Sequence, residues 1–541
     1  MKKSHFATAL VAAFAFVLTA SPFVLAQPGP PAFPRDLVVT TDKGQVKGMI
    51  DDLVENFFGI PYAAPPTKNL RWQPPQPATN WKGVRLAEQY GNACPQGESI
   101  DAPRTVTEDC LFLNVQRPIG TEADAKLPVF VYIHGGGLTG GSSDNEKLDK
   151  IARDNGVIGV AMNYRLGALG FFAHAALSVQ GGESGNYGLM DQRAALRWVQ
   201  DNIAAFGGDP AQVTIAGESA GGWSVCAHLA APSSRGLFAR AMIQSGGCAF
   251  NSVAEAEMSG DKLAAELGCA DADNVLACLR RKPVAVLIDA ENVEAKPAYG
   301  TAFLPTDPQV AVKTGDFTRV PVVIGGTRDE GRAFSRDSIG WTQADYTAWV
   351  RASSDFGSSA EAVLARYAWP VTASEFTPAY LVAAVITDSS TLAGGVERGV
   401  GACTNRVLAQ DFSEHVPTYA YEFAHRGGPN WFDVLEPKKA YVGGAGHAVE
   451  LPYLFPERLN GLDAAEFTAA ERRLADELTQ YWGAFVKDGD PQVAGQISWP
   501  LYNAKRSLLA LEAGGQSVVM TDAAFTAEHH CDLWDDLASK D

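Results

Sequence analysis

The chain has 541 residues, and 46% of them are hydrophobic, which is enough to bury a large core. Its formal net charge of −18 argues against nucleic acid or an anionic membrane as a partner, because like charges repel. No internal repeat, low-complexity block or long linker interrupts the sequence, so we expect one large domain.

The first 26 residues carry the pattern of a secretory signal peptide. Two lysines precede an apolar stretch over residues 6–25, and small side chains stand before a cleavage position after Ala26. A membrane anchor is the alternative, which Pro22 and the cleavage pattern argue against. We therefore expect an exported protein, secreted or periplasmic, whose mature domain spans residues 27–541 and has a net charge of −20.

A buried strand is predicted over residues 127–133, and it runs directly into His134 and three glycines. Taken alone, a triple glycine indicates a flexible turn. Glycines also let a backbone approach a substrate closely, and backbone N–H groups are the usual means of holding an oxyanion. Because a second motif follows downstream, we favour an oxyanion loop with Gly136 and Gly137 as donors.

That second motif is a nucleophile elbow around Ser219. A β-branched run over residues 212–216 leads into Gly217-x-Ser219-x-Gly221, and a helix-compatible segment over residues 223–231 follows. Glycines two positions before and after the serine are needed because side chains there would collide with the neighbouring strand and helix. We interpret Ser219 as the nucleophile and the N–H of Ala220 as a third oxyanion donor.

A serine nucleophile needs a base and an orienting carboxylate, which follow in the order acid, then histidine, in this class. Residues 320–326 predict a buried strand, and the loop at its carboxyl end offers Asp329 or Glu330 as the acid. We take His447 as the base because the loop Gly443-Gly-Ala-Gly446 precedes it. The other histidines are placed in a helix core or beside a strand (His228, His415 and His425).

His529, His530 and Cys531 resemble a metal-binding cluster. No fourth ligand stands nearby in the sequence, so we predict no metal site. No organic cofactor is implied either.

The spacing of the buried strands favours an α/β fold. Runs of 15 to 20 residues separate them, which is long enough for crossover helices and favours a mainly parallel sheet. Antiparallel hairpins are predicted over residues 37–50 and 508–521, and a helix over residues 464–486.

These motifs together resemble the type-B carboxylesterases, the cholinesterase-like branch of the α/β-hydrolases. The resemblance runs from about residue 37 to residue 541 and includes the segments 58–63, 108–115, 163–167, 186–192, 206–221, 329–331 and 446–453. Gln116 departs from the apolar residue that is usual at its position. The resemblance implies the α/β-hydrolase fold, a mixed and mostly parallel sheet flanked by helices in a single large domain.

The resemblance also implies roles for individual residues. It selects Glu330 rather than Asp329 as the acid and supports His447 as the base. Three further residues match family positions that line or support the site: Glu218, Ser245 and Glu450.

Export predicts disulfides, and the family pattern implies three of them. The implied pairs are Cys94–Cys110, Cys269–Cys278 and Cys403–Cys531. Cys226 and Cys248 remain, either as buried thiols or as a fourth bridge, and we favour the thiols.

The loop that the first disulfide would close argues against a cholinesterase. Choline-binding relatives place a Trp there, whereas residues 95–109 contain no aromatic side chain. Arg104 and Arg332 could contact a carboxylate on an acidic ester, although surface salt bridges are the favoured interpretation.

We therefore expect a secreted serine carboxylesterase that forms an acyl-enzyme on Ser219 and acts on bulky small-molecule esters. Architecture and length also suggest a detoxifying enzyme similar to the secreted bacterial fumonisin esterases, which release tricarballylate. Two alternatives stay open. One is a non-catalytic adhesion or binding protein on the same scaffold, which the presence of Ser219, Glu330 and His447 argues against. The other is a serine amidase or peptidase. The sequence does not predict an oligomeric state.

Overall fold

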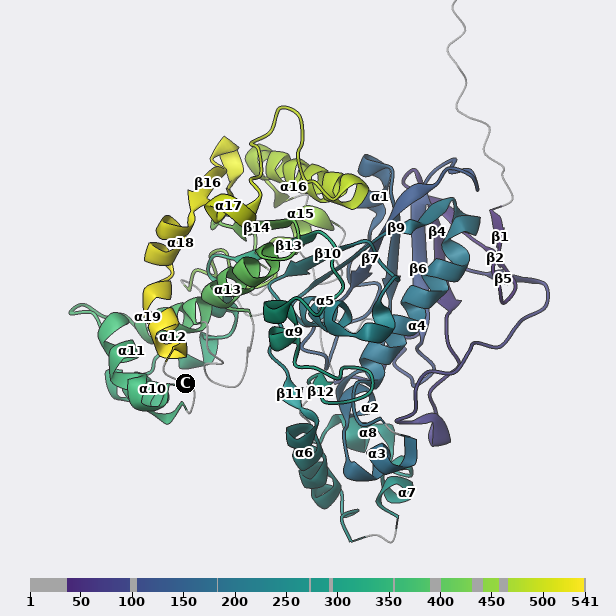
Figure 1. Ribbon diagram of the computed structural model, residues 1–541, viewed down its shortest axis with the longest axis horizontal. Helices are drawn as coiled ribbons and strands as arrows, with labels where there is room; N and C mark the ends of the chain where they lie inside the picture. Colours follow the sequence, from purple (N-terminus) through teal and green to yellow (C-terminus); the bar gives the residue numbers. More distant parts are fainter. Residues whose placement is uncertain are drawn as a thin grey trace, which may run out of the picture. The chain divides into compact units, whose positions relative to one another are not determined.

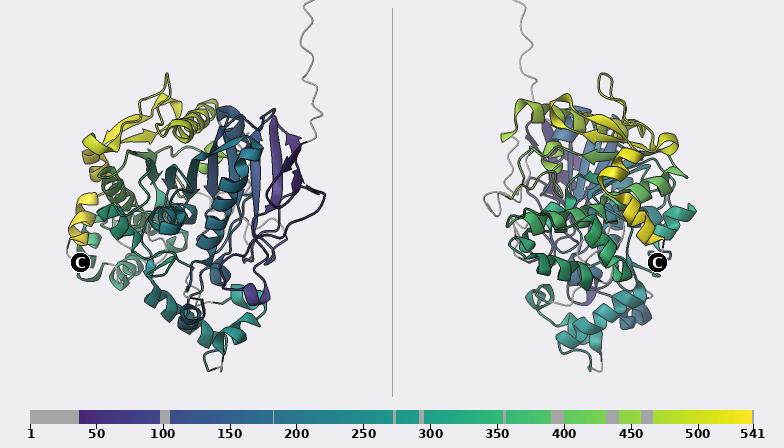
Figure 2. Two further views of the ribbon diagram at one scale, coloured as in Figure 1. Left: turned by 45° about the vertical axis from the view of Figure 1, so that its right-hand side comes forward. Right: turned by 90° about the vertical axis from the view of Figure 1, so that its left-hand side faces the viewer.

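An eleven-stranded sheet runs through the centre of the protein, in the order β16-β15-β14-β13-β10-β9-β7-β8-β6-β4-β3. Every pairing from β15 across to β8 is parallel, and the pairings at both edges are antiparallel. In Figures 1 and 2 the purple N-terminal strands form one edge and the yellow C-terminal strand the other. The α/β class and the mixed, mostly parallel sheet that the sequence predicted are confirmed.

The computed structural model describes residues 37–97, 105–181, 183–271, 274–290, 295–353, 356–389, 400–430, 441–456 and 466–539. Residues Leu37–Asp541 form one compact unit. The predicted signal peptide and Arg104 lie outside the described residues.

The strands of the large sheet are β3 (Met49–Asp51), β4 (Val54–Pro61), β6 (Phe112–Pro118), β7 (Leu127–Ile133), β8 (Ile158–Met162), β9 (Gly208–Glu218), β10 (Arg240–Gln244), β13 (Val322–Thr327), β14 (Thr418–Phe423), β15 (Ser507–Leu511) and β16 (Val518–Thr521). One small sheet contains β1 (Val38–Thr40), β2 (Gln45–Lys47) and β5 (Val84–Leu86). A second contains β11 (Asn251–Ser252) and β12 (Ala298–Tyr299).

The described α-helices are α1 (Asp149–Asn155), α2 (Gly167–Phe171), α3 (Ala175–Gly181), α4 (Tyr187–Asn202), α5 (Ala220–Ala230), α6 (Val253–Glu266), α7 (Val275–Arg280), α8 (Val284–Ile288), α9 (Pro308–Thr314), α10 (Gln343–Ala352), α11 (Ala360–Arg366), α12 (Thr377–Asp388), α13 (Ala402–Ser413), α15 (Leu451–Leu454), α16 (Ala469–Asp488), α17 (Tyr502–Lys505), α18 (Asp522–Glu528) and α19 (Cys531–Ala538). The 3-10 turns are η1 (Lys68–Leu70), η2 (Ile203–Phe206), η3 (Pro232–Ser234), η4 (Glu330–Ala333), η5 (Arg336–Ser338), η6 (Gly357–Ser359) and η8 (Ala513–Gly515).

Helices cover both faces of the sheet, because its strands are apolar on both sides. Successive side chains of a strand point to opposite faces. In β7, Val129 and Val131 accordingly join the core that contains α4 and α5, whereas Phe130 and Tyr132 join the core that contains α16. This double burial explains why β7 and β9 are nearly continuous apolar runs in the sequence.

The predicted hairpins and helix are present with small changes. Residues 37–50 form the β1–β2 hairpin, but β3 at the end of this range leaves it and pairs with β4 in the large sheet. The second hairpin is β15–β16. Helix α16 begins five residues later than predicted, at Ala469, where Thr468 and Glu471 form a capping box.

All eight cysteines form disulfides. The pairs are Cys94–Cys110, Cys226–Cys248, Cys269–Cys278 and Cys403–Cys531. Three are the pairs that the resemblance implied. The expectation of free thiols at Cys226 and Cys248 is wrong, because α5 packs on β10 and brings the two Cα atoms within 5.5 Å in a fully buried position.

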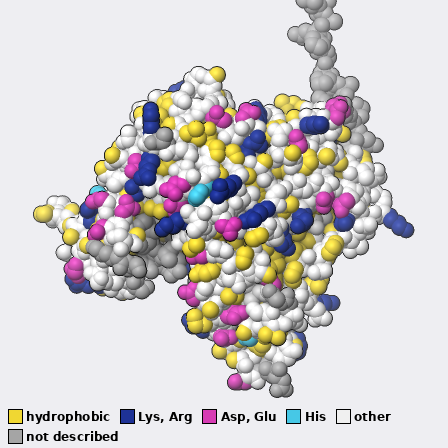
Figure 3. All heavy atoms as spheres, in the orientation of Figure 1, with side chains coloured by type: hydrophobic (Ala, Val, Ile, Leu, Met, Phe, Trp, Pro, Cys, Tyr) yellow, Lys and Arg dark blue, Asp and Glu magenta, His cyan; other side chains and the backbone are white. Residues whose placement is uncertain are grey.

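The surface mixes charges of both signs. On the face drawn in Figure 3, acidic and basic side chains are interspersed with apolar ones. Over the residues that the structure describes, no helix has both the length and the apolar character needed to cross a bilayer.

Candidate active site

Ser219 occupies a strained turn between β9 and α5. Its backbone has φ 56° and ψ −123°, a conformation that non-glycine residues adopt only where the surroundings enforce it. The Ser219 N–H donates to the carbonyl of Gln244 in β10 at 2.9 Å, and the Trp223 N–H donates to the Ser219 carbonyl at 3.0 Å. The turn is therefore held from the sheet on one side and from the helix on the other.

The glycines of the elbow are required sterically, as predicted. A Cβ atom on Gly217 would lie 2.5 Å from the carbonyl carbon of Gly221, and one on Gly221 would lie 2.0 Å from the carbonyl oxygen of Ile133. Both distances are far below a van der Waals contact. The elbow thus packs its helix directly against β7, the strand that leads to the triple glycine.

His447 and Glu330 are in direct contact. The Nδ1 atom of His447 lies 2.6 Å from Oε2 of Glu330, which is fully buried. The other carboxylate oxygen of Glu330 accepts from the Thr327 N–H at 2.7 Å and from the Ser245 hydroxyl at 2.6 Å. These bonds hold the carboxylate in one orientation, so that an ionised Glu330 accepts from an Nδ1–H and leaves Nε2 of His447 available as a base.

Asp329, the other acid that the sequence offered, faces different partners. Its two carboxylate oxygens accept from Arg426 at 2.7 and 2.8 Å, and one also accepts from the Ala445 N–H at 3.0 Å. Burial opposes its ionisation, but these bonds and the nearby Arg332 guanidinium bring the pKa of Asp329 below its ordinary value. Arg332 pairs with Asp329 at 3.3 Å, as the salt-bridge interpretation expected.

The imidazole of His447 also contacts Glu218, the residue before Ser219. Nε2 of His447 lies 3.1 Å from Oε1 of Glu218, and the Phe334 ring lies 5.0 Å from the imidazole, centroid to centroid. His447 and Glu330 thus lie beside the residue that precedes Ser219 in the chain, and all three side chains are buried.

Three buried carboxyl groups, those of Glu218, Glu330 and Glu450, act on the phenol of Tyr421. Burial, together with the charges of Glu450, Glu330 and Glu218, raises the pKa of the Tyr421 phenol well above its usual range. Glu450 is fully buried, as Glu330 is. Such a field favours a positive charge on a nearby imidazole, which a base acquires when it takes a proton. The sequence did not single out Tyr421, because nothing distinguishes it there from an ordinary core residue.

The triple-glycine loop touches the elbow. A Cβ on Gly135 would lie 3.3 Å from Cβ of Ser219 and 2.9 Å from Glu218. Gly136 and Gly137 have φ of 97° and 62°, in the left-handed region that favours glycine. The Gly136 carbonyl accepts from the N–H groups of Thr139 and Gly140 at 3.0 and 2.9 Å, so the loop is a hydrogen-bonded turn.

His134, which opens this loop, is a buried side chain. Burial lowers its pKa to about 4, and its ring stacks on Tyr164 with centroids 4.3 Å apart. The side chain is therefore neutral at physiological pH and serves as packing beneath the loop.

A cavity of about 480 Å³ adjoins the loop and has a mainly uncharged lining. It is lined by Pro95, Gln96, Gly97, Gly136, Thr139, Gly140, Leu166, Gly167, Ala168, Leu169, Leu287, Ile288, Asp289 and Ala290. A volume of this size is typical of small-molecule sites. Leu166 and Gly167 belong to the segment 163–167 that the resemblance includes, whereas residues 287–290 at α8 carried no recognisable signal in the sequence.

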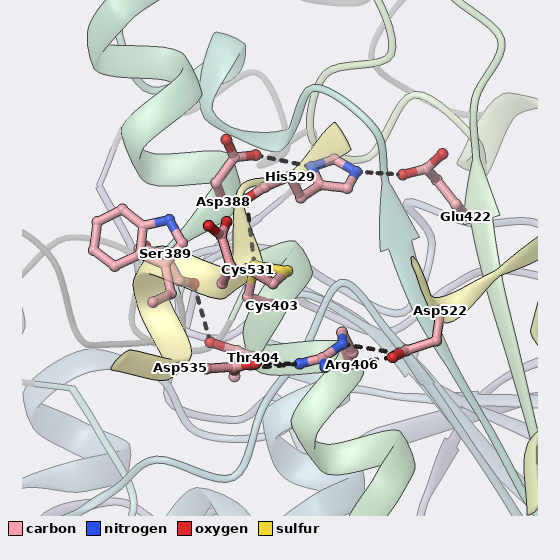
Figure 4. The surroundings of a disulfide bond; sticks show 12 residues. Asp388, Ser389, Cys403, Thr404, Arg406, Glu422, Asp522, His529, Cys531 and Asp535 are labelled. Carbon is pink, nitrogen blue, oxygen red and sulfur yellow. Dashed lines mark hydrogen bonds and ion pairs between the residues drawn. A yellow bond between two sulfur atoms is a disulfide. The ribbon is translucent and has the colours of Figure 1, made fainter. Parts of the chain in front are cut away.

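The possible metal cluster at the end of the chain is a hydrogen-bonded network instead. His529 lies between two carboxylates, 2.8 Å from Asp388 and 2.6 Å from Glu422, and Cys531 is bonded to Cys403 (Figure 4). The Cys531 sulfur is thus not available as a ligand. Within the described ranges, no group of three or more potential ligands could hold a metal ion.

The remaining histidines also have structural partners. His228 is buried between Ser234 and Gln192, at 2.9 and 3.0 Å, and burial lowers its pKa to about 3. His425 contacts Glu512 and Glu471.

Comparison with known proteins gives consistent matches over almost the whole chain. The profile of the Carboxylesterase family matches residues 35–534. Fumonisin B1 esterase from Sphingopyxis macrogoltabida is 34% identical over 530 residues, covering 94% of this chain and 91% of the relative. Para-nitrobenzyl esterase from Bacillus subtilis is 33% identical over 501 residues (88% and 95%), and pyrethroid hydrolase Ces2e from Rattus norvegicus is 31% identical over 504 residues (87% and 85%).

Proposed function

The chain belongs to the carboxylesterase family and is a carboxylic ester hydrolase of the type-B class, and from this premise we propose that it cleaves esters through Ser219, His447 and Glu330. The observation that carries the proposal is the buried contact of 2.6 Å between His447 and Glu330, next to the elbow that bears Ser219. A histidine oriented by a carboxylate beside a serine is the arrangement that activates a hydroxyl for acyl transfer.

The reaction then proceeds in two halves. His447 takes the proton of the Ser219 hydroxyl through Nε2 while the oxygen attacks the ester carbonyl carbon. The N–H groups of Gly136, Gly137 and Ala220 hold the oxyanion. His447 returns the proton to the departing alcohol, and an acyl-enzyme remains. A water molecule, deprotonated by His447, releases the acid and restores the serine.

The surrounding carboxylates stabilise the protonated form of His447 in this scheme. Glu330 does so through Nδ1, while Ser245 fixes the orientation of Glu330 through their 2.6 Å bond. Glu218, 3.1 Å from Nε2, and the buried Glu450 add to the negative field. Protonating the imidazole of His447 costs less free energy beside these carboxylates than it would without them. The barrier to proton transfer from Ser219 is therefore lower.

The substrates that this site suits best are bulky esters. The adjoining cavity of about 480 Å³ supports this, because it exceeds what a short acyl group fills. Tricarballylate esters such as fumonisins belong to the proposal, supported by the similarity to fumonisin B1 esterase. Export after cleavage near Ala26 is supported by the four disulfides, which persist in oxidising compartments.

Replacement of the nucleophile tests the proposal. We expect Ser219→Ala to lower kcat on p-nitrophenyl acetate by at least about 10³-fold, because the remaining groups cannot form an acyl-enzyme. Ser374→Ala, at an exposed serine outside the site, is the matched control and keeps full activity. Mass spectrometry after treatment with diethyl p-nitrophenyl phosphate should place the phosphoryl group on Ser219. Full activity of Ser219→Ala would contradict the proposal.

A further inference from the structure

A second pocket, away from the elbow, is unusually basic. Its volume is about 540 Å³, and its lining consists of Lys68, Asn69, Arg71, Ala277, Arg280, Arg281, Lys282 and Pro283. We call these residues the basic pocket. Five of the eight carry a positive charge and none carries a negative one. The pocket lies between η1 and the connection from α7 to α8, and Figure 1 shows α7 and α8 at one end of the unit together with α3 and α6.

The walls of the basic pocket are held together by a buried arginine. The guanidinium of Arg71 donates to Glu108 at 2.5 and 2.7 Å, which balances its charge. Its remaining nitrogen donates to the carbonyls of Arg280 and Lys282 at 3.1 and 2.7 Å, and Arg280 donates back to the Arg71 carbonyl at 3.2 Å. Two segments about two hundred residues apart in the chain are thereby fixed against each other.

Among the residues that the structure describes, the other cations of the basic pocket have no acidic partner. The side chains of Lys68, Arg281 and Lys282 form no ion pair with any residue that the structure describes, and the guanidinium of Arg280 donates to the neutral amide of Gln180 at 3.1 Å. This is uncommon in a chain of net charge −18, in which acidic residues outnumber basic ones. Cations that converge without counter-charges on a concave surface focus a positive potential into it.

We propose that the basic pocket binds a small molecule that carries two or more carboxylate or phosphate groups. Arginine and lysine are the side chains that pair with such groups most strongly, and Arg281 can offer a planar donor pair to them. The volume is within the range of small-molecule sites, and the cations stand on both walls, so that one ligand can contact Lys68 on one side and Lys282 on the other.

The basic pocket and the cavity beside Gly136 lie at opposite ends of helix α8. Pro283 lines the basic pocket, and Leu287 lines the cavity beside Gly136. Helix α8 joins them, and its five residues span about 7.5 Å at the rise of an α-helix. The anion can therefore be a free ligand or the acidic end of an ester whose carbonyl reaches Ser219. This second source rests on the proposed function.

The binding test uses citrate as the probe and the mature enzyme, with isothermal titration calorimetry at low and at high salt. We expect saturable binding that weakens with salt, and at least a tenfold loss of affinity in Arg281→Gln/Lys282→Gln. The Arg71 bonds in this region use the backbone carbonyl of Lys282, which the substitution keeps. Lys505→Gln/Arg506→Gln is the matched control, an exposed Lys-Arg pair at α17, and it should bind citrate as the unaltered enzyme does.

The possible outcomes distinguish this proposal from the alternative explanations. Absence of citrate binding, or equal binding by all three proteins, would overturn it. Kinetics with p-nitrophenyl hydrogen sebacate and neutral p-nitrophenyl decanoate identify the source of the anion. A KM that rises only for the sebacate ester in Arg281→Gln/Lys282→Gln assigns the pocket to the substrate, and unchanged KM values with lost citrate binding assign it to a free anion. Because calorimetry needs no turnover, failure of the proposed esterase mechanism would not affect the binding result.

Discussion

Two neighbouring carboxylates, Asp329 and Glu330, have different bonding partners. Glu330 accepts from groups that orient it toward His447, whereas Asp329, one position earlier, accepts from Arg426 and from the backbone of Ala445. The Asp329 N–H also donates to the Ala445 carbonyl at 2.8 Å. Asp329 is thus bonded twice to the loop that carries His447, and we propose that it positions the imidazole through this backbone.

We expect Asp329→Asn to lower kcat by about tenfold with little change in KM, because small displacements of a base are costly in rate. Asparagine keeps an acceptor for Ala445 but loses the charge that holds Arg426. Steady-state kinetics on p-nitrophenyl acetate provide the measurement. Asp316→Asn, which removes an exposed partner of Arg235, is the control. Unchanged kcat in Asp329→Asn would rule out the positioning role.

The raised pKa of the buried His529 makes the free energy of unfolding decrease at alkaline pH. Although burial alone favours the neutral ring, hydrogen bonds and charges from Asp388 and Glu422 raise its pKa from 6.5 to about 9. The folded state therefore binds a proton more tightly than the unfolded state. The stabilisation, roughly 3 kcal/mol, is fully present below pH 6.5 and is lost as the pH rises through about 9.

We expect His529→Gln to be less stable than the unaltered protein at pH 6.5 and to approach it at pH 9.5. Urea unfolding midpoints across this range give the comparison. His415→Gln, at a partly exposed histidine, should leave the pH dependence unchanged. A constant difference between His529→Gln and the unaltered protein at every pH would show that the charge of His529 contributes nothing.

At the scale of elements, the elbow depends on the close approach of α5 to β7. We expect Gly221→Ala to lose most of its activity and to unfold at a lower temperature, since the added Cβ would lie 2.0 Å from the Ile133 carbonyl oxygen. Ser374→Ala, at an exposed serine outside the site, is the control. Thermal unfolding and p-nitrophenyl acetate turnover provide the readouts. A fully active, equally stable Gly221→Ala would show that the backbone there adjusts freely.

Elements with strong local patterns were predictable from the sequence. The elbow, the β15–β16 hairpin and α16 depend on glycine spacing, alternation and helical period, which are local properties. The state of Cys226 and Cys248 was not predictable, because it depends on how α5 packs against β10. The same limit applies to Tyr421, whose carboxylate neighbours come from β9, η4 and the segment after His447. The basic pocket likewise joins η1 to α7, and no sequence period links them.

At the scale of the molecule, the disulfides should contribute in the order of the loops that they close. Cys403–Cys531 spans 128 residues, Cys226–Cys248 spans 22 and Cys269–Cys278 spans 9. By chain entropy their removal should cost about 5, about 3.5 and about 2.5 kcal/mol.

Double Cys→Ser variants of each pair, compared by urea unfolding, measure this order. The short Cys269–Cys278 loop acts as the internal reference, because its variant should be the least affected. Equal losses in all three variants would contradict the entropic explanation and point to local packing around each bridge.

The contact between Gly221 and the Ile133 carbonyl also bears on laboratory evolution of this enzyme. Because helix α5 and strand β7 meet with no room for even a methyl group, we expect that point substitutions cannot move Ser219 and the triple-glycine loop independently. Libraries that randomise residues 217, 221 or 135 will therefore yield mainly inactive clones. Diversity placed at 166–169 and 287–290, around the adjoining cavity, can alter which esters are accepted while the reacting groups keep their geometry.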